Sequence, residues 1–214
     1  MNIKLIDPTS GGPVQSEAVV WGMRKPTVDI LVRPETPEIG IVHDDPEEAF
    51  YRDLLEIIRY GVSHSVAVEN IQMEIKSRRH ASVIPMEEIG IYVMQVVLDG
   101  PSQPVNSPQE LLNYVKTTIT HLVQVFVNLI NEDEQEIELI NAIETVAIGN
   151  RMVSHIFQHI LYHLYDKDII SQESILSWHG IEPLNYEMKK RTSLRKSIDT
   201  IVEWLQNADT DSSD

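Results

Sequence analysis

Three histidines at four-residue spacing are the side chains in this sequence best placed to carry out chemistry. His155, His159 and His163 occur in a segment with helical periodicity, so they lie near one another along a helix surface. Two histidines at this spacing can bind zinc, which would permit a metal-dependent enzyme. The apolar residues of the segment form a separate stripe, and the histidines run from its opposite side to its edge. The alternative is an ordinary solvated or interface face, and we expect no metal and no cofactor.

The sequence lacks the motifs of common nucleotide-dependent and nucleophilic enzymes. It contains no Walker-type phosphate loop, dinucleotide fingerprint, nucleophile elbow or His-Glu-x-x-His motif. It contains no cysteine, which excludes disulfides, cysteine-based zinc sites and cysteine nucleophiles. The 33 acidic residues form many carboxylate pairs, but spacing distinguishes none of them as an acid–base site.

The acidic character of the chain indicates which partners it can bind. A formal net charge of −16 repels phosphate backbones and anionic lipids, so nucleic acids and membrane surfaces are poor partners. A basic protein is a better expectation, although acidity can also serve solubility alone. The N-terminus lacks the apolar segment of a signal peptide, and no run of about 18 apolar residues occurs. We therefore expect a soluble, cytoplasmic protein.

Helical periodicity begins near residue 44 and continues to about residue 206. Asp45-Pro46 and Ser107-Pro108 each combine a capping residue with a proline at the first helical position. The clearest apolar stripe follows Ser107 and consists of Leu111, Val115, Ile119, Leu122, Phe126 and Leu129. The expected helices span about 45–61, 66–79, 85–98, 108–129, 133–148, 151–165, 171–178 and 187–206.

These elements predict three regions. Residues 1–43 contain several prolines and form an irregular arm, because proline disfavours long helices. Residues 44–206 form an all-helical domain, and residues 207–214 form an acidic tail that frays. Helices joined by short loops predict an all-α fold of antiparallel helical hairpins stacked side by side.

The end of the helical region carries two acidic and aromatic boxes. The first runs from Leu161 to Trp178 and contains Leu-Tyr-Asp-Lys-Asp-Ile-Ile, and the second runs from Ile201 to Asp209 and contains Trp204-Leu205. These segments resemble the two boxes of the W2 domain, which occurs in the epsilon subunits of initiation factor 2B, in initiation factor 5 and in initiation factor 4G. The resemblance implies a HEAT-like α-solenoid.

The first helices resemble the epsilon subunits in particular. Gly61, Asn70 and the segment Met73-Glu74-Ile75-Lys76-Ser77 resemble that family's pattern of Gly, Asn and Leu-Glu-Ile-Asn-Ser, and Val96-Val97-Leu98 resembles its next helix end. The resemblance covers about residues 45–214. Three residues depart from the family pattern: Lys76 replaces an Asn, Arg78 a Leu and Val83 an Asn. They lie close to the family's exchange surface, so they put the exchange activity in doubt.

The resemblance implies a guanine-nucleotide exchange factor that releases GDP from translation initiation factor 2. Its partners would be the gamma GTPase subunit and the lysine-rich beta-subunit tail, with other subunits of initiation factor 2B as further candidates. Such a factor needs no covalent chemistry, because it acts by preferring the nucleotide-free partner. Glu74 matches the family's functional surface glutamate. The alternative interpretation is that Glu74 is a solvated helix residue.

The two boxes imply a docking site for lysine-rich segments. Its acidic residues would attract lysines, and its aromatic rings would contact lysine stems or ammonium groups. The expected binding residues are Tyr165, Asp166, Asp168, Glu173, Trp178, Glu203, Trp204, Asp209 and Asp211. Tyr165 and Trp178 are alternatively core residues, whereas Trp204 lies off the centre of its apolar stripe and favours partial exposure. A second function is also open, that of a W2 adaptor that binds the same factor without catalysing exchange.

Overall fold

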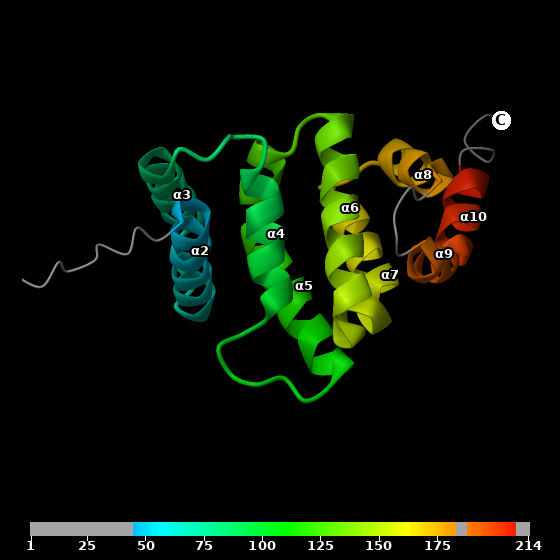
Figure 1. Ribbon diagram of the computed structural model, residues 1–214, viewed down its shortest axis with the longest axis horizontal. Helices are drawn as coiled ribbons and strands as arrows, with labels where there is room; N and C mark the ends of the chain where they lie inside the picture. Colours follow the sequence, from blue (N-terminus) through cyan, green and yellow to red (C-terminus); the bar gives the residue numbers. More distant parts are fainter. Residues whose placement is uncertain (1–44, 183–187, 209–214) are drawn as a thin grey trace, which may run out of the picture. The chain divides into compact units, whose positions relative to one another are not determined.

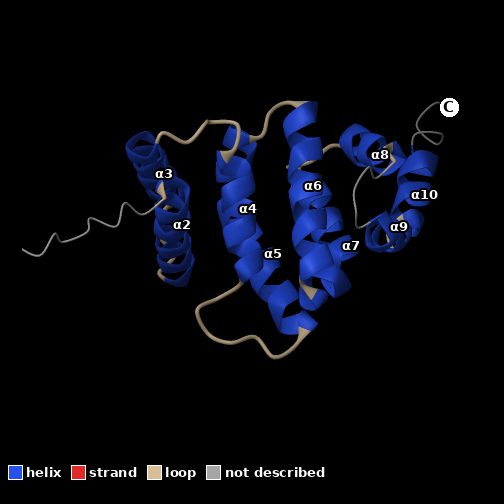
Figure 2. Cartoon of the chain, viewed as in Figure 1, coloured by secondary structure: helices blue, strands red, loops and turns tan. Residues whose placement is uncertain are grey.

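The described part of the chain is entirely helical. The structure is a computed structural model that describes residues 45–182 and 188–208, and within these ranges it contains nine helices and no strand (Figure 2). The predicted all-α class is therefore confirmed. The helices are α2 (Pro46–Ser63), α3 (Val68–Ser82), α4 (Ile89–Asp99), α5 (Pro108–Leu129), α6 (Asp133–Gly149), α7 (Arg151–Asp166), α8 (Gln172–Gly180), α9 (Met188–Lys196) and α10 (Asp199–Ala208).

The first six helices form stacked hairpins in two layers. Helices α2 and α3, α4 and α5, and α6 and α7 pair as neighbours along the chain (Figure 1). Between hairpins, α2 contacts α4 and α4 contacts α6, whereas α3 contacts α5 and α5 contacts α7. Each hairpin thus buries its faces against the next, as in α-solenoids. The last three helices add to one end, where α8 and α9 pack on α6 and α10 packs on α8.

Capping residues fix the beginnings of two helices where the sequence predicts them. Asp45 accepts a hydrogen bond from the Glu47 backbone N–H over 3.1 Å. Ser107 Oγ accepts from the Glu110 N–H over 3.2 Å, and the Glu110 carboxylate reaches back to the Asn106 N–H. These bonds satisfy donors that a helix start leaves unpaired.

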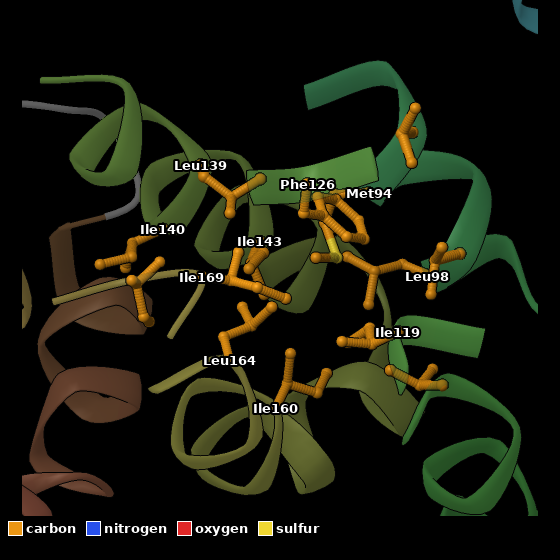
Figure 3. Close-up of a cluster of buried hydrophobic side chains, with 14 of the residues drawn as sticks. Met94, Leu98, Ile119, Phe126, Leu139, Ile140, Ile143, Ile160, Leu164 and Ile169 are labelled. Atoms are coloured by element: carbon orange, nitrogen blue, oxygen red, sulfur yellow. The ribbon is translucent and has the colours of Figure 1, made fainter. Parts of the chain in front are cut away.

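The core runs through all the hairpins. All six residues of the predicted α5 stripe are buried, and residues from α4, α6 and α7 complete the layer around them. Figure 3 labels ten members of one cluster: Met94, Leu98, Ile119, Phe126, Leu139, Ile140, Ile143, Ile160, Leu164 and Ile169. Packing of these apolar faces provides most of the stability of such helices.

Gly61 marks the closest approach of α2 to α3. A Cβ atom at this position would lie 2.6 Å from Ile71 Cδ1 and 3.0 Å from Ile71 Cγ1. Ile71 is itself buried, so a larger side chain at position 61 would displace a core residue. This contact gives a packing reason for the glycine in the sequence pattern.

The predicted single helix over 187–206 is wrong. The chain instead forms α9 and α10, separated by Ser197 and Ile198. The Ser197 hydroxyl donates to the Leu194 carbonyl, and the Ile198 N–H bonds the Arg195 carbonyl three residues back. A polar side chain that competes for helix carbonyls favours such an interruption. The break still lets Leu194, Ile198 and Leu205 reach the core.

Other boundaries differ by a few residues. The expected helix at Pro85 begins at Ile89, after a turn over residues 86–88. Helix α10 continues to Ala208, and the arm predicted for 1–43 and residues 209–214 of the predicted tail lie outside the described residues. In the described ranges, every helix is too short or too polar to cross a membrane.

Candidate functional site

Three aromatic rings meet at the surface where α7 and α10 come together. The Trp204 ring lies 6.0 Å from the Tyr165 ring, edge to face, and 6.2 Å from the Tyr162 ring. Trp204 is 49% exposed and Tyr162 is 46% exposed, so solvent reaches both rings. Asp166 follows Tyr162 by one helical turn and Glu203 precedes Trp204, and both are exposed. We call these five residues the aromatic–acidic surface.

The Asp166 carboxylate is ionised in this setting. Lys167 Nζ lies 3.0 Å from Asp166 Oδ2, and this hydrogen bond and charge hold the pKa of Asp166 below its ordinary value. Lys167 therefore offsets part of the negative potential of this surface. A cationic partner would have to compete with Lys167 or use the remaining oxygen of the carboxylate.

Asp168 ends helix α7. Its φ of 53° is left-handed, a conformation that aspartate tolerates better than most residues. The Asp168 N–H bonds the Tyr165 carbonyl, and the Ile169 N–H bonds the Leu164 carbonyl. This pattern is a Schellman cap, and the buried pair Leu164 and Ile169 supplies its apolar contact (Figure 3). The exposed Asp168 carboxylate thus occupies a position with a structural role of its own.

Trp178 lies in the core, where its ring is out of reach of a binding protein. The residue is 0% exposed, and its Nε1–H donates to Asn141 Oδ1 over 3.0 Å. The core alternative raised by the sequence therefore holds for Trp178, and a direct contact between its ring and a partner does not fit the structure. Tyr165 is half-buried and still borders the exposed rings. Glu173 is exposed on the first turn of α8.

The beginning of α8 is fixed by Glu136 of α6. The Ser171 N–H and Oγ both donate to Glu136 Oε2, over 2.6 Å and 2.7 Å. Ser171 Oγ also accepts from the Ser174 N–H as the N-cap. The first box therefore contains a helix stop, a cap and a core tryptophan, and these features position the exposed residues around them.

A buried ion network connects α6 to α9. Glu144 is 0% exposed, and its two carboxylate oxygens accept from Arg195 Nε over 2.9 Å and from Arg195 Nη2 over 3.2 Å. Arg191 Nη1 donates to the same carboxylate. Arg195 also donates to the carbonyls of Trp178 and Ile181, and its guanidinium lies 4.5 Å from the centroid of the Trp178 ring. This network holds α9, which precedes α10 and Trp204.

Glu144 was not predicted from the sequence, although the sequence contains a signal for it. Glu144 lies within the apolar stripe of α6, between Ile143 and Ala147. A carboxylate in such a stripe requires a buried cation, because an unpaired charge is costly in the core. Arg195 likewise lies next to a buried apolar residue, Leu194. Its position therefore indicates it as the cation that pairs with Glu144.

Glu74 is exposed on α3 beside a cavity. The cavity measures about 260 Å³ and is lined by Asp53, Glu56, Ile57, Tyr60, Glu74 and Arg78. Arg78 Nη1 forms an ion pair with Asp53 Oδ2 over 3.4 Å. The cavity therefore presents three carboxylates and one guanidinium to solvent, and Glu74 and the aromatic–acidic surface occupy different hairpins.

The three departures from the sequence pattern have distinct environments. Lys76 is exposed, and Arg78 is engaged with Asp53. Val83 is 86% exposed and ends α3 with a φ of 58°. A β-branched residue is strained in that left-handed conformation, whereas asparagine adopts it readily.

The three histidines of α7 do not converge. His155 and His159 are exposed, and His155 Nδ1 lies 2.6 Å from the Arg151 carbonyl oxygen. His163 is half-buried, with Nε2 3.2 Å from the Lys116 carbonyl oxygen and 3.1 Å from Thr120 Oγ1. Within 45–182 and 188–208, no group of three His, Asp or Glu side chains could hold a metal ion. Asp209 and Asp211, two of the predicted binding residues, lie outside these ranges.

Comparisons with known proteins point to one group. Residues 135–214 match the family model described as "W2: eIF4-gamma/eIF5/eIF2-epsilon". The chain is 26% identical over 168 residues to "Translation initiation factor eIF2B subunit epsilon" of Dictyostelium discoideum, covering 76% of this chain and 23% of that protein. It is 26% identical over 164 residues to "eIF5-mimic protein 2-B" of Danio rerio, covering 75% of this chain and 37% of that protein.

A shorter match is to another translation initiation factor. The chain is 33% identical over 85 residues to "Probable eukaryotic translation initiation factor 5-2" of Arabidopsis thaliana, covering 38% of this chain and 18% of that protein. The chain thus spans well under half the length of these relatives. Its residues 135–214 match the W2 family model, and about three quarters of the chain is similar to the eIF2B subunit epsilon of Dictyostelium discoideum and to the eIF5-mimic protein of Danio rerio.

Proposed function

We propose that this chain binds translation initiation factor 2 and promotes release of its GDP. The observation that carries the docking part is the Trp204 ring, held against Tyr162 and Tyr165 with both Trp204 and Tyr162 half exposed. Such rings offer flat faces to lysine stems and ammonium groups. Asp166 and Glu203 beside them supply the opposite charge. A lysine-rich segment, as on the beta subunit of initiation factor 2, fits this chemistry.

Calorimetric titration with a synthetic lysine-rich peptide tests the docking. Trp204→Ala should weaken binding about tenfold or more, because the ring is the central contact of the surface. Met86→Ala is the control, since Met86 is a large apolar residue that is 42% exposed and lies outside both the aromatic–acidic surface and the Glu74 cavity. If Trp204→Ala binds the peptide as Met86→Ala and the wild type do, the aromatic–acidic surface is not the docking site.

The exchange part depends on the cavity between α2 and α3. Glu74 is exposed at its edge and can pair with a basic side chain or disturb the Mg²⁺ and phosphate site of the GTPase. Exchange follows when the nucleotide-free partner binds here more tightly than the GDP-bound partner. The similarity to the eIF2B subunit epsilon of Dictyostelium discoideum supports this proposal.

A non-catalytic adaptor is the second candidate, and Arg78 favours it. The Arg78–Asp53 ion pair adds a cation beside Glu74, which weakens the attraction of the cavity for a basic partner residue. The similarity to the eIF5-mimic protein of Danio rerio fits this candidate as well. An adaptor would bind the lysine-rich peptide through the aromatic–acidic surface and leave the rate of GDP release unchanged.

A further inference from the structure

Arg195 bonds to three separate parts of the fold. Its guanidinium donates to both carboxylate oxygens of Glu144 on α6, from Nε over 2.9 Å and from Nη2 over 3.2 Å. Its Nη1 donates over 3.0 Å to the carbonyl of Trp178 on α8 and also to the carbonyl of Ile181, which caps that helix. Its own backbone carbonyl accepts from the Ile198 N–H over 3.0 Å, at the break between α9 and α10. Arg195 thus joins α6, the end of α8 and the beginning of α10.

The break between α9 and α10 links Arg195 to Trp204. The Ile198 carbonyl accepts from the N–H groups of Ile201 and Val202, over 2.8 Å and 3.0 Å, in the first turn of α10. Ile198 is itself buried, so the break is anchored in the core. Trp204 lies two residues beyond Val202 on the same short helix. Because such a helix moves as a rigid element, its direction at the break determines where the Trp204 ring lies beside α7.

Contacts between α8 and α10 also hold α10. Gln172 Nε2 donates to the Leu205 carbonyl over 3.2 Å, and His179 Nε2 lies 3.1 Å from Asp199 Oδ1. The side chains of His179 and Asp199 are 27% and 51% exposed, so solvent weakens their attraction. These contacts attach α10 to α8, and Arg195 in turn bonds the end of α8. The position of α10 therefore depends on Arg195 both directly and through α8.

Arg191 provides a comparison, because it pairs with the same carboxylate. Arg191 Nη1 donates to Glu144, and its Nη2 donates to Thr145 Oγ1 over 3.2 Å. Both of these partners are on α6, so these bonds attach α9 to α6. With two arginines beside one buried carboxylate, Glu144 keeps a counter-charge when either arginine is lost. Charge balance therefore does not require Arg195, and buried ionic groups can specify a conformation instead of adding stability.

We propose that Arg195 is a positioning residue of the aromatic–acidic surface and sets the place of the Trp204 ring against Tyr162 and Tyr165. A guanidinium suits this role, because its planar fork bonds a carboxylate and two carbonyls at once, which a single ammonium group does not. A ring already held in place loses little freedom when a partner docks, so the affinity of the surface depends on this position. The effect on affinity rests on the proposed docking function, whereas the effect on the position of the ring does not.

Fluorine NMR of the chain labelled with 5-fluorotryptophan tests the positioning. The sequence contains three tryptophans, and Trp→Phe variants assign each resonance. Arg195→Met should shift or broaden the Trp204 resonance, because the ring loses its fixed place. The Trp178 resonance should move as well, since the Arg195 guanidinium lies 4.5 Å from that ring. Arg191→Met is the matched control: it removes the other cation of Glu144 from the same helix and should leave the Trp204 resonance unchanged.

Calorimetric titration with the lysine-rich peptide measures the effect on the surface. Arg195→Met should bind the peptide about three- to tenfold more weakly than the wild type, as for residues coupled through one network. Arg191→Met should bind as the wild type does. Ile75→Val controls for loss of stability, because Ile75 is buried on α3 in another hairpin. It should lower the thermal midpoint and leave both the Trp204 resonance and the affinity unchanged.

The proposal is overturned if the Trp204 resonance of Arg195→Met matches that of Arg191→Met, or if Ile75→Val produces the same shift. A shifted resonance with unchanged affinity would overturn the link between position and binding. If the wild type does not bind the lysine-rich peptide, the docking function fails, and the NMR comparison still decides the role of Arg195. If Arg195→Met does not fold, Arg195→Lys keeps a cation beside Glu144 and should shift the Trp204 resonance by a smaller amount, and no shift would overturn the proposal.

Discussion

Arg195 donates through Nε to Glu144 Oε1 over 2.9 Å, and both residues are buried. Glu144→Gln would leave Arg191 and Arg195 without their counter-charge in the core. We expect the free energy of unfolding to fall by about 3–5 kcal/mol, as for other buried ion pairs that lose one partner. Urea denaturation followed by circular dichroism measures this loss as a lower midpoint.

Glu138→Gln is the control for the ion network. Glu138 is exposed on the same helix, so its substitution should change stability by less than about 0.5 kcal/mol. Equal midpoints for the two variants would mean that the Glu144 network contributes nothing to the attachment of α9.

Val83→Asn should stabilise the protein. Val83 ends α3 in the left-handed region and is 86% exposed, so the substitution relieves strain and removes almost no packing. The expected gain is about 1 kcal/mol in the free energy of unfolding. Val127→Asn tests the strain argument, because Val127 is partly exposed inside α5 and should gain nothing. A gain of equal size at both positions would contradict it.

The two tryptophans of the boxes should differ in their effects on stability. Trp178→Ala removes a fully buried ring and its hydrogen bond to Asn141, which should cost about 3–5 kcal/mol. Trp204→Ala removes a half-exposed ring and should cost only about 1 kcal/mol. Chemical denaturation of both variants measures the difference, and a larger loss for Trp204→Ala would show that the ring is a core residue in solution.

His163 should make the stability depend on pH. Burial lowers the pKa of His163 from its ordinary value of 6.5, and this effect outweighs the hydrogen bond to the Lys116 carbonyl, which raises it. The unfolded chain therefore takes up the proton first as the pH falls. The contribution of neutral His163 to the free energy of unfolding is fully present above pH 6.5. It is lost as the pH falls from 6.5 to the lower pKa of His163 in the folded protein.

Replacement of His163 isolates this contribution. As the pH is lowered from 7.5 to 5, the free energy of unfolding should fall more for the wild type than for His163→Gln. Urea midpoints at several pH values give this comparison. Parallel pH profiles for the two proteins would mean that protonation of His163 is not linked to folding.

The sequence predicts the local features of this fold because their causes are local. The caps at Asp45 and Ser107 and the apolar stripe of α5 depend only on neighbouring residues and helical spacing. The break between α9 and α10 was missed, because apolar residues on both sides of Ser197 continue the same helical spacing. Whether this segment forms one helix or two depends instead on the packing of α9 against α6, which joins residues far apart in the chain.

The candidate site also combines features that follow from the local sequence with features that depend on contacts between distant residues. Partial exposure of Trp204 was predictable from its position beside the apolar stripe. The contact between Trp204 and Tyr162 was not, since it joins α7 to α10 across a long separation in sequence. The structural role of Asp168 also stayed hidden, because only the backbone conformation reveals a Schellman cap. Box residues that look equivalent in the sequence therefore separate into structural and exposed ones.

Release of labelled GDP from purified translation initiation factor 2 is the measurement that tests the proposed exchange function most directly. The chain should accelerate release, and Glu74→Gln should abolish the acceleration while it leaves binding of the lysine-rich peptide unchanged. Glu69→Gln, on the same helix and outside the cavity lining, should behave as the wild type does. No acceleration by a wild-type chain that binds the factor would contradict exchange and leave the adaptor. Equal acceleration by wild type and Glu74→Gln would contradict the assignment of the active surface to the α2–α3 cavity.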